Sequence, residues 1–96
     1  MIKLKSSKEL DKIRESCKLL ATVFQGLEKI VEPGITTAEL DTFAYNQIVK
    51  AQGIPAFLNY MGYPASLCVS VNEEVIHGIP GRRVLRNGDI VSLDLG

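Results

Sequence analysis

The chain contains a single histidine, His77, in a setting that suits proton transfer. It lies between Val75-Ile76 and Gly78-Ile79-Pro80, and the flanking glycine and proline predict a defined loop. An imidazole gains and loses a proton near neutral pH, so His77 is a candidate for contact with a reacting group. Taken alone, the residue favours a simpler role, that of a loop histidine satisfied by backbone carbonyls.

The second candidate is Asp94, a carboxylate within the apolar segment 90–95. Read as a strand, this segment places Asp94 on one face with Ile90 and Ser92, while valine and leucine face the other way. Burial of an unpaired carboxylate is costly, so Asp94 should face water, pair with a cation or coordinate a metal ion. Taken alone, exposure or a role at the strand end is favoured, because one carboxylate does not make a metal site.

Aromatic and sulfur-containing side chains gather in the interval 57–68. They are Phe57, Tyr60, Met61, Tyr63 and Cys68. Such a lining suits an apolar substrate side chain, and an ordinary satellite core would use the same residues. The sequence has neither a glycine-rich phosphate loop after a strand nor a serine in a nucleophile elbow, so nucleotide-binding and serine-hydrolase functions have no support.

Two amphipathic helices are predicted ahead of these residues. Ser6 with Glu9 has the spacing of a capping box, and Glu32-Pro33-Gly34 ends the first helix after about Val31. Its apolar stripe consists of Leu10, Ile13, Cys17, Leu20, Phe24, Leu27 and Val31. Stripes of this spacing are far more often packing surfaces than cofactor sites, so we expect this one in the core.

A second capping box, Thr36 with Glu39, starts the next helix, and Gly53 stands where that helix should end. Its apolar positions are Leu40, Phe43, Ala44, Ile48 and Ala51. The two helices should be antiparallel and joined by a short turn.

Strands are predicted after the helices. Residues 67–71 alternate between branched apolar and small side chains, which predicts a half-buried strand, and the polar segment 72–81 predicts a loop. Asn87-Gly88 is a favourable turn pair before a second strand over 90–95. The fold class is therefore α/β, of the α+β type, with two helices followed by strands of an antiparallel sheet.

Composition limits the function further. The 96 residues suit one domain, and 46% hydrophobic and 23% charged residues are typical of a folded soluble protein. Eleven basic residues balance eleven acidic ones without an extended basic run, which argues against a nucleic-acid partner. No signal-peptide or membrane-spanning segment is present, and Cys17 and Cys68 lack the spacing of a disulfide scaffold, so we expect a cytoplasmic protein with reduced thiols.

Two motifs carry a resemblance to a known family. The segment from Tyr60 to Gly81, with SVNEEVIHGIP at its end, and the segment from Asn87 to Gly96, NGDIVSLDLG, strongly resemble type I methionine aminopeptidases. The resemblance covers essentially the whole chain. It implies the pita-bread metallopeptidase fold, in which helices cover the outer face of a curved antiparallel sheet that carries two metal ions. The chain would be the amino-terminal portion, 1–96, of one such catalytic domain.

The resemblance also implies roles for the candidate residues. The family's metal ligands are two aspartates, a histidine and two glutamates, and by motif position Asp94 matches the first aspartate, with the other four beyond Gly96. His77 matches the family histidine that contacts the substrate near the scissile amide, which makes it the catalytic candidate. Phe57, Tyr60, Tyr63 and Cys68, with His77, match positions that bind the substrate, and the family pattern varies at Phe57 and Met61.

The implied activity of the intact protein is metal-dependent removal of the initiator methionine from newly made polypeptides. The two divalent ions would be manganese, iron, cobalt or zinc, and they would activate a bridging water. One carboxylate cannot fix such a centre, so we expect the 96 residues alone to be inactive and to lack a carboxyl-terminal part of the fold as partner. Two alternatives are a non-catalytic peptide-binding module of the pita-bread family and another pita-bread peptidase, such as a proline-specific relative.

Overall fold

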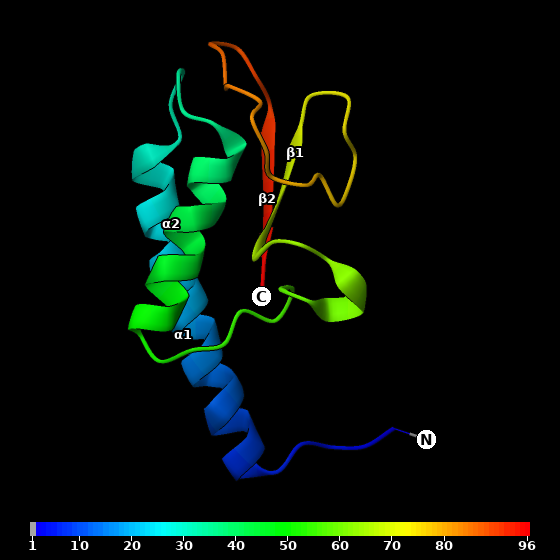
Figure 1. Ribbon diagram of the computed structural model, residues 1–96. Coiled ribbons are helices and arrows are strands. Elements are labelled where there is room, and N and C mark those ends of the chain that lie inside the picture. Colours follow the sequence, from blue (N-terminus) through cyan, green and yellow to red (C-terminus); the bar gives the residue numbers. More distant parts are fainter. Residues whose placement is uncertain (1) are drawn as a thin grey trace.

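The computed structural model describes residues 2–96, which form two helices followed by two antiparallel strands. Helix α1 spans Ser7–Ile30 and helix α2 spans Thr37–Lys50. Strand β1 spans Leu67–Val71 and strand β2 spans Val91–Leu95. The predicted order of elements is confirmed, and Figure 1 shows the helix pair as one layer beside the two-stranded sheet.

Both helices begin at the capping boxes that the sequence predicts. The Ser6 hydroxyl accepts from the Glu9 N–H and the Glu9 carboxylate accepts from the Ser6 N–H. Thr36 and Glu39 make the same reciprocal pair at α2. Each box satisfies backbone donors that a helix start leaves without partners, so these starts are fixed locally.

Helix α2 ends at Lys50, three residues before Gly53, and the left-handed residue of the following turn is Gln52, with φ +65°. The Gly53 N–H donates to Ile48 O at 2.9 Å, and a Cβ on Gly53 would lie only 2.8 Å from Leu19 Cδ2. Gly53 thus does not supply the left-handed residue of the turn, and a side chain here would require that of Leu19 to move.

The core lies between the helix pair and one face of the sheet. Its buried apolar residues come from α1, α2, both strands and the segment before the turn at 86–89. They are Val23, Leu27, Leu40, Ala44, Ile48, Leu67, Val69, Val71, Leu85 and Leu95. This arrangement keeps the second face of the sheet for the polar and sulfur-containing residues of the strands.

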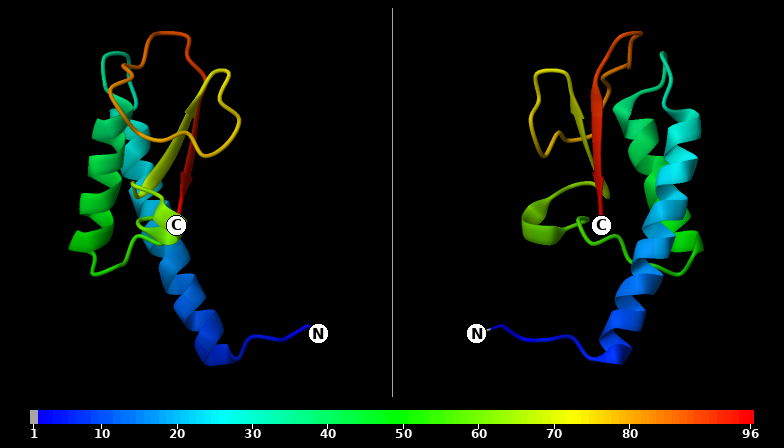
Figure 2. Two further views of the ribbon diagram at one scale, coloured as in Figure 1. Left: turned by 45° about the vertical axis from the view of Figure 1, so that its right-hand side comes forward. Right: turned by 180° about the vertical axis from the view of Figure 1, so that it is seen from behind.

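The apolar stripe of α1 enters this core only in part, which corrects the prediction. Leu10 is 40% and Ile13 is 45% exposed, and Cys17 is also exposed, whereas Val23 and Leu27 are buried. Helix α1 is about 36 Å long and α2 about 21 Å, at 1.5 Å per residue. The first half of α1 therefore extends past the end of α2, as Figure 2 shows.

Strand β1 is fully buried rather than half-buried, a second correction. All five of its residues are buried, including Cys68 and Ser70 on the face away from the core. Segment 72–81 folds back along this strand, and Val69 N–H donates to Gly78 O at 2.9 Å. The alternation of side chains is as predicted, but the sequence has no periodic signal that a loop covers the second face.

The turn before β2 forms as predicted, and Asp89 N–H donates to Arg86 O at 3.1 Å with Gly88 at φ +92°. Strand β2 begins at Val91, one residue later than predicted. Within residues 2–96 no helix is both long and apolar enough to cross a membrane.

Candidate functional site

A cavity of about 470 Å³ opens beside the outer face of β1. It brings together all five residues that the sequence singled out for substrate binding: Phe57, Tyr60, Tyr63, Cys68 and His77. Met61 lines it too, and so do Gly62, Pro64 and Ile79, which the sequence did not assign. Their proximity to the aromatic residues or to His77 in the chain was the one signal that could have found them.

The aromatic wall comes from a tight double turn between α2 and β1. Asn59, just before the 3-10 turn Tyr60–Gly62, and Met61, within it, adopt left-handed backbone conformations, with φ +66° and +48°. Asn59 N–H donates to Tyr63 O at 2.8 Å, and Tyr63 N–H donates to Tyr60 O at 2.9 Å. These bonds close the turn so that Tyr60 and Met61 remain 66% and 91% exposed at the cavity.

Tyr63 joins the aromatic wall to the strand beneath it. Its ring meets Phe57 edge to face, with centroids 6.5 Å apart and planes at 87°. Its hydroxyl lies 3.0 Å from Leu67 O and 3.2 Å from Gly78 O. Burial is the main cause that raises the pKa of Tyr63, followed by its hydrogen bond with Cys68, so the phenol keeps its proton at neutral pH and can donate.

His77 is brought to the cavity by the loop that crosses β1. Its Nδ1 lies 4.0 Å from Cys68 Sγ, and its ring is exposed at the mouth of the cavity. The residue adopts a left-handed conformation, with φ +56°, which residues other than glycine rarely adopt. Flanking glycine and proline were expected to define this loop, and the contacts of Gly78 show how: its amide donates to Ser70 Oγ at 3.1 Å.

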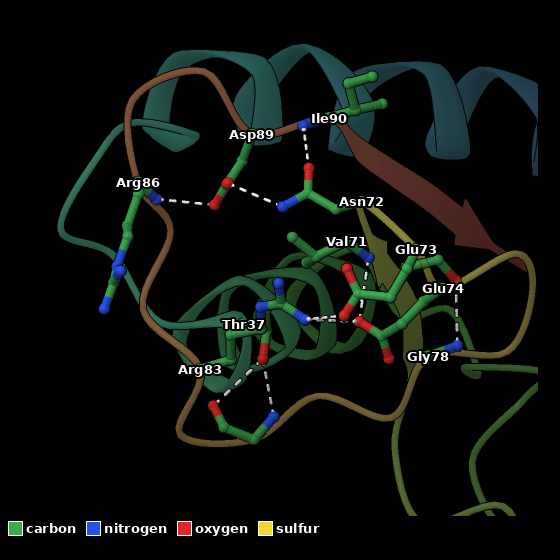
Figure 3. A network of polar contacts seen from close by, with 12 residues as sticks. Thr37, Val71, Asn72, Glu73, Glu74, Gly78, Arg83, Arg86, Asp89 and Ile90 are labelled. Carbon is green, nitrogen blue, oxygen red and sulfur yellow. Dashed lines mark hydrogen bonds and ion pairs between the residues drawn. The ribbon is translucent and has the colours of Figure 1, made fainter.

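Charged residues tie the first half of this loop down (Figure 3). Arg83 Nη1 lies 3.2 Å from Glu73 and 3.5 Å from Glu74, and Glu74 also accepts from Val71 N–H at 3.1 Å. Hydrogen bonds with its own backbone and with Arg83 lower the pKa of Glu73. Each ion pair is exposed and weak alone, but together they bridge the loop to the segment before β2.

Two further polar contacts fix the ends of the connection between the strands (Figure 3). Asn72 donates to Asp89 at 2.9 Å and accepts from Ile90 N–H at 2.9 Å. The bond from Asn72 and the bond from the Arg86 amide lower the pKa of Asp89. In the middle of the connection, the buried Thr37 hydroxyl accepts from the Gly81 N–H at 2.8 Å.

Asp94 is exposed on the same sheet face as Cys68, its partner across the strands. The prediction that Asp94 faces away from the valine and leucine side chains of β2 is therefore confirmed. Within residues 2–96 no group of three or more histidine, cysteine, aspartate or glutamate side chains is placed to hold a metal ion. Asp94 offers a carboxylate that a divalent ion could use, but the described donors do not fit a complete metal centre.

One residue that positions the site was missed from the sequence. Asp41, in α2, accepts from the N–H groups of Ser66 at 2.8 Å and Leu67 at 2.9 Å through one carboxylate oxygen. It thereby fixes the start of β1 and hence the place of Cys68. An aspartate in a helix usually faces solvent, so its residue type gave no signal of this contact.

The pocket, the docked histidine loop and the carboxylate on the adjoining strand agree with the comparisons with known proteins. Residues 11–96 match the model of metallopeptidase family M24, so the chain belongs to that family. It is 52% identical over 95 residues to the methionine aminopeptidase of Borreliella burgdorferi and 49% identical over 96 residues to methionine aminopeptidase 1 of Bacillus subtilis. Those matches cover 99% and 100% of this chain.

Solved structures agree with the sequence relatives. The methionine aminopeptidase of Rickettsia prowazekii superposes with a TM-score of 0.95 at 42% identity, and that of Thermotoga maritima with 0.95 at 38% identity. Each superposition covers 99% of this chain. The chain spans 38% and 39% of the length of the Borreliella and Bacillus relatives. It therefore has the fold of the amino-terminal part of the pita-bread structure.

Proposed function

We propose that the cavity binds the side chain of an amino-terminal methionine, as the substrate half of a methionine aminopeptidase. The observation that carries this is the lining: aromatic rings, Met61 and a thiol enclose an apolar space with His77 at its mouth. Its volume of about 470 Å³ lies within the range of small-molecule sites. An unbranched thioether fits such soft walls because it adapts its shape and makes favourable sulfur contacts with rings.

His77 supplies the polar group of this site. A methionine side chain inside the cavity would leave the backbone of its residue at the mouth, where the His77 imidazole is exposed. There the imidazole can donate a hydrogen bond toward the carbonyl of the scissile amide and stabilise charge that develops on its oxygen. Polypeptides emerging from ribosomes are the expected substrates, and a cytoplasmic location suits them.

We infer that hydrolysis requires metal ions that Asp94 would help to hold. When bound, a pair of divalent ions such as manganese, iron, cobalt or zinc supplies an activated water. Because residues 2–96 do not provide a complete ligand set, hydrolysis needs metal ligands beyond those residues. The alternative function, a non-catalytic peptide-binding module, would use the same pocket. It differs in one respect: no longer form of the protein would hydrolyse the bound peptide.

Binding can be tested by NMR titration of the 96-residue chain with L-methioninamide, using L-alaninamide as the ligand without a long apolar side chain. We expect methioninamide to shift the signals of cavity residues and to bind about tenfold more tightly, since burying a larger apolar side chain is worth over 1 kcal/mol. Equal binding of the two amides would contradict the proposal.

A matched pair of variants locates the binding site. Tyr60 lines the cavity and is 66% exposed, while Tyr45 lies on α2, is 40% exposed and does not line the cavity. Tyr60→Ala should weaken methioninamide binding several-fold, and Tyr45→Ala should leave it unchanged.

A separate experiment tests hydrolysis. Release of methionine from a short peptide by the chain alone, with manganese or cobalt added, would show that the chain needs no further metal ligands.

A further inference from the structure

Gly78, the residue after His77, makes three hydrogen bonds, two of them with β1. Its N–H donates to Ser70 Oγ at 3.1 Å, and its carbonyl accepts from Val69 N–H at 2.9 Å. The carbonyl also accepts at 3.2 Å from the Tyr63 hydroxyl, which shares its one proton with Leu67 O at 3.0 Å. A Cβ at this position would lie 2.0 Å from Val69 O. The backbone that follows His77 is therefore pressed directly onto the strand.

Ser70 is placed for this contact and for little else. It is 4% exposed in the middle of β1, and it does not line the cavity. A buried hydroxyl needs a partner, and the Gly78 amide is a partner from the histidine loop. Its cross-strand neighbour Ser92 is exposed and shares the residue type without this contact, which makes Ser92 a natural control.

Tyr63 links the same clamp to the pocket. Tyr63 is part of the cavity wall, and its hydroxyl lies 3.2 Å from the Gly78 carbonyl, which does not line the cavity. The left-handed conformation of His77 is uncommon for residues other than glycine, so contacts outside the residue help to maintain it. The bonds at Gly78 are the nearest such contacts along the chain.

We propose that Ser70 and Tyr63 are positioning residues, which clamp Gly78 onto β1 and thereby hold His77 beside Cys68 at the mouth of the pocket. The proposal deepens the proposed function and rests on it for its importance to substrate. It also implies that a change in the position of Tyr63 in the pocket wall changes the position of His77. Neither residue acts on substrate through its hydroxyl in this scheme, since both hydroxyls are engaged with the backbone.

The test uses NMR of the labelled 96-residue chain without ligand. His77 is the only histidine, so its ring signals are assigned without ambiguity. We expect a nuclear Overhauser contact between the His77 ring and the Cys68 side chain in the parent protein. Ser70→Ala and Tyr63→Phe should each weaken that contact at least about twofold and move the ring signals toward those of a flexible histidine. The reason is that conformers with the loop docked on β1 lose population.

Controls separate positioning from general damage. Ser70→Thr keeps the hydroxyl and should restore the contact, and Ser92→Ala should leave it unchanged. Unchanged backbone signals from α1 and α2 would show that a variant is folded. If the His77 contact with Cys68 survives in folded Ser70→Ala and Tyr63→Phe proteins, the proposal is wrong.

Hydrogen exchange tests the clamp without any substitution. The Gly78 amide should exchange at least about tenfold more slowly than the amides of the exposed part of the loop, such as Val75, because it is bonded to Ser70. Unprotected exchange at Gly78 would overturn the proposal even if the variants did not fold. Methioninamide binding is measured separately, so failure of the pocket function and failure of the clamp give different results.

Discussion

Cys68 and Asp94 lie directly opposite each other in the antiparallel pairing of β1 with β2. Paired residues share a sheet face, so the thiol that lines the pocket and the exposed carboxylate are cross-strand neighbours. His77 reaches the same place from the loop, 4.0 Å from Cys68. Cys68 is thus the neighbour of residues from two other segments of the chain, Asp94 of β2 and His77 of the loop.

The fit of Gly78 against β1 predicts a large effect of adding one methyl group. A Cβ there would lie 2.0 Å from Val69 O, an atom of the strand backbone that cannot move aside without breaking the pairing. Gly78→Ala should therefore lower the free energy of unfolding by more than about 2 kcal/mol, the scale of severe strain in a core. Urea unfolding followed by circular dichroism measures it.

Gly81 provides the control for this prediction, since a Cβ there would have no atom within 4 Å and its φ is not left-handed. Gly81→Ala should change stability by no more than about 0.5 to 1 kcal/mol, with a gain expected from the less flexible unfolded chain. Equal losses in the two variants would show that loop flexibility, and not the contact with Val69, sets the cost.

Asp41 should matter more than an ordinary surface aspartate. Its carboxylate accepts from Ser66 and Leu67 N–H groups, and Asp41→Ala would leave both donors without that partner at the buried start of β1. We expect a loss of about 1 to 3 kcal/mol in the free energy of unfolding. Asp11→Ala is the comparison, because Asp11 makes an exposed pair with Arg14, and it should cost little. A cost for Asp41→Ala as small as that for Asp11→Ala would contradict this role.

The hydrogen bonds of Asp89 predict a dependence of stability on pH. They lower its pKa in the folded state, so Asp89 stabilises the fold above its ordinary pKa of 3.8, and this stabilisation is lost as the pH falls through the lower, folded pKa. The urea midpoint should therefore drop on acidification below about pH 4. Asp89→Asn should reduce the drop without removing it, because Glu9 and Glu73 also have lowered pKa values. An unchanged acid profile in Asp89→Asn would exclude the contribution.

Features set by neighbours in the sequence were the ones predicted well. Both capping boxes involve residues three positions apart, so spacing alone identifies the helix starts. The strands follow from alternation, and the motif around His77 identified the family. For these features the local sequence preferences agree with the final fold, which is why the features could be predicted without the structure.

Features set by contacts between distant residues were missed. The bonds of Asp41 join residues 25 and 26 positions apart, and those of Thr37 with Gly81 join residues 44 positions apart. The full burial of Ser70 likewise depends on a loop that returns over β1. Each residue type is ordinary in its local segment, and nothing in that segment records where a distant part of the chain will dock.

The place of Asp94 leads to a final prediction about metal ions. Its carboxylate is exposed beside the pocket, but among residues 2–96 no three possible ligands converge, and affinity for a divalent ion grows with the number of converging ligands. Calorimetric titration of the chain with manganese or cobalt should therefore show no tight site, and Asp94→Asn should give the same trace. Micromolar or tighter binding that Asp94→Asn abolishes would contradict this, and it would mean that the other ligands of the centre are supplied within these residues or by a second copy of the chain.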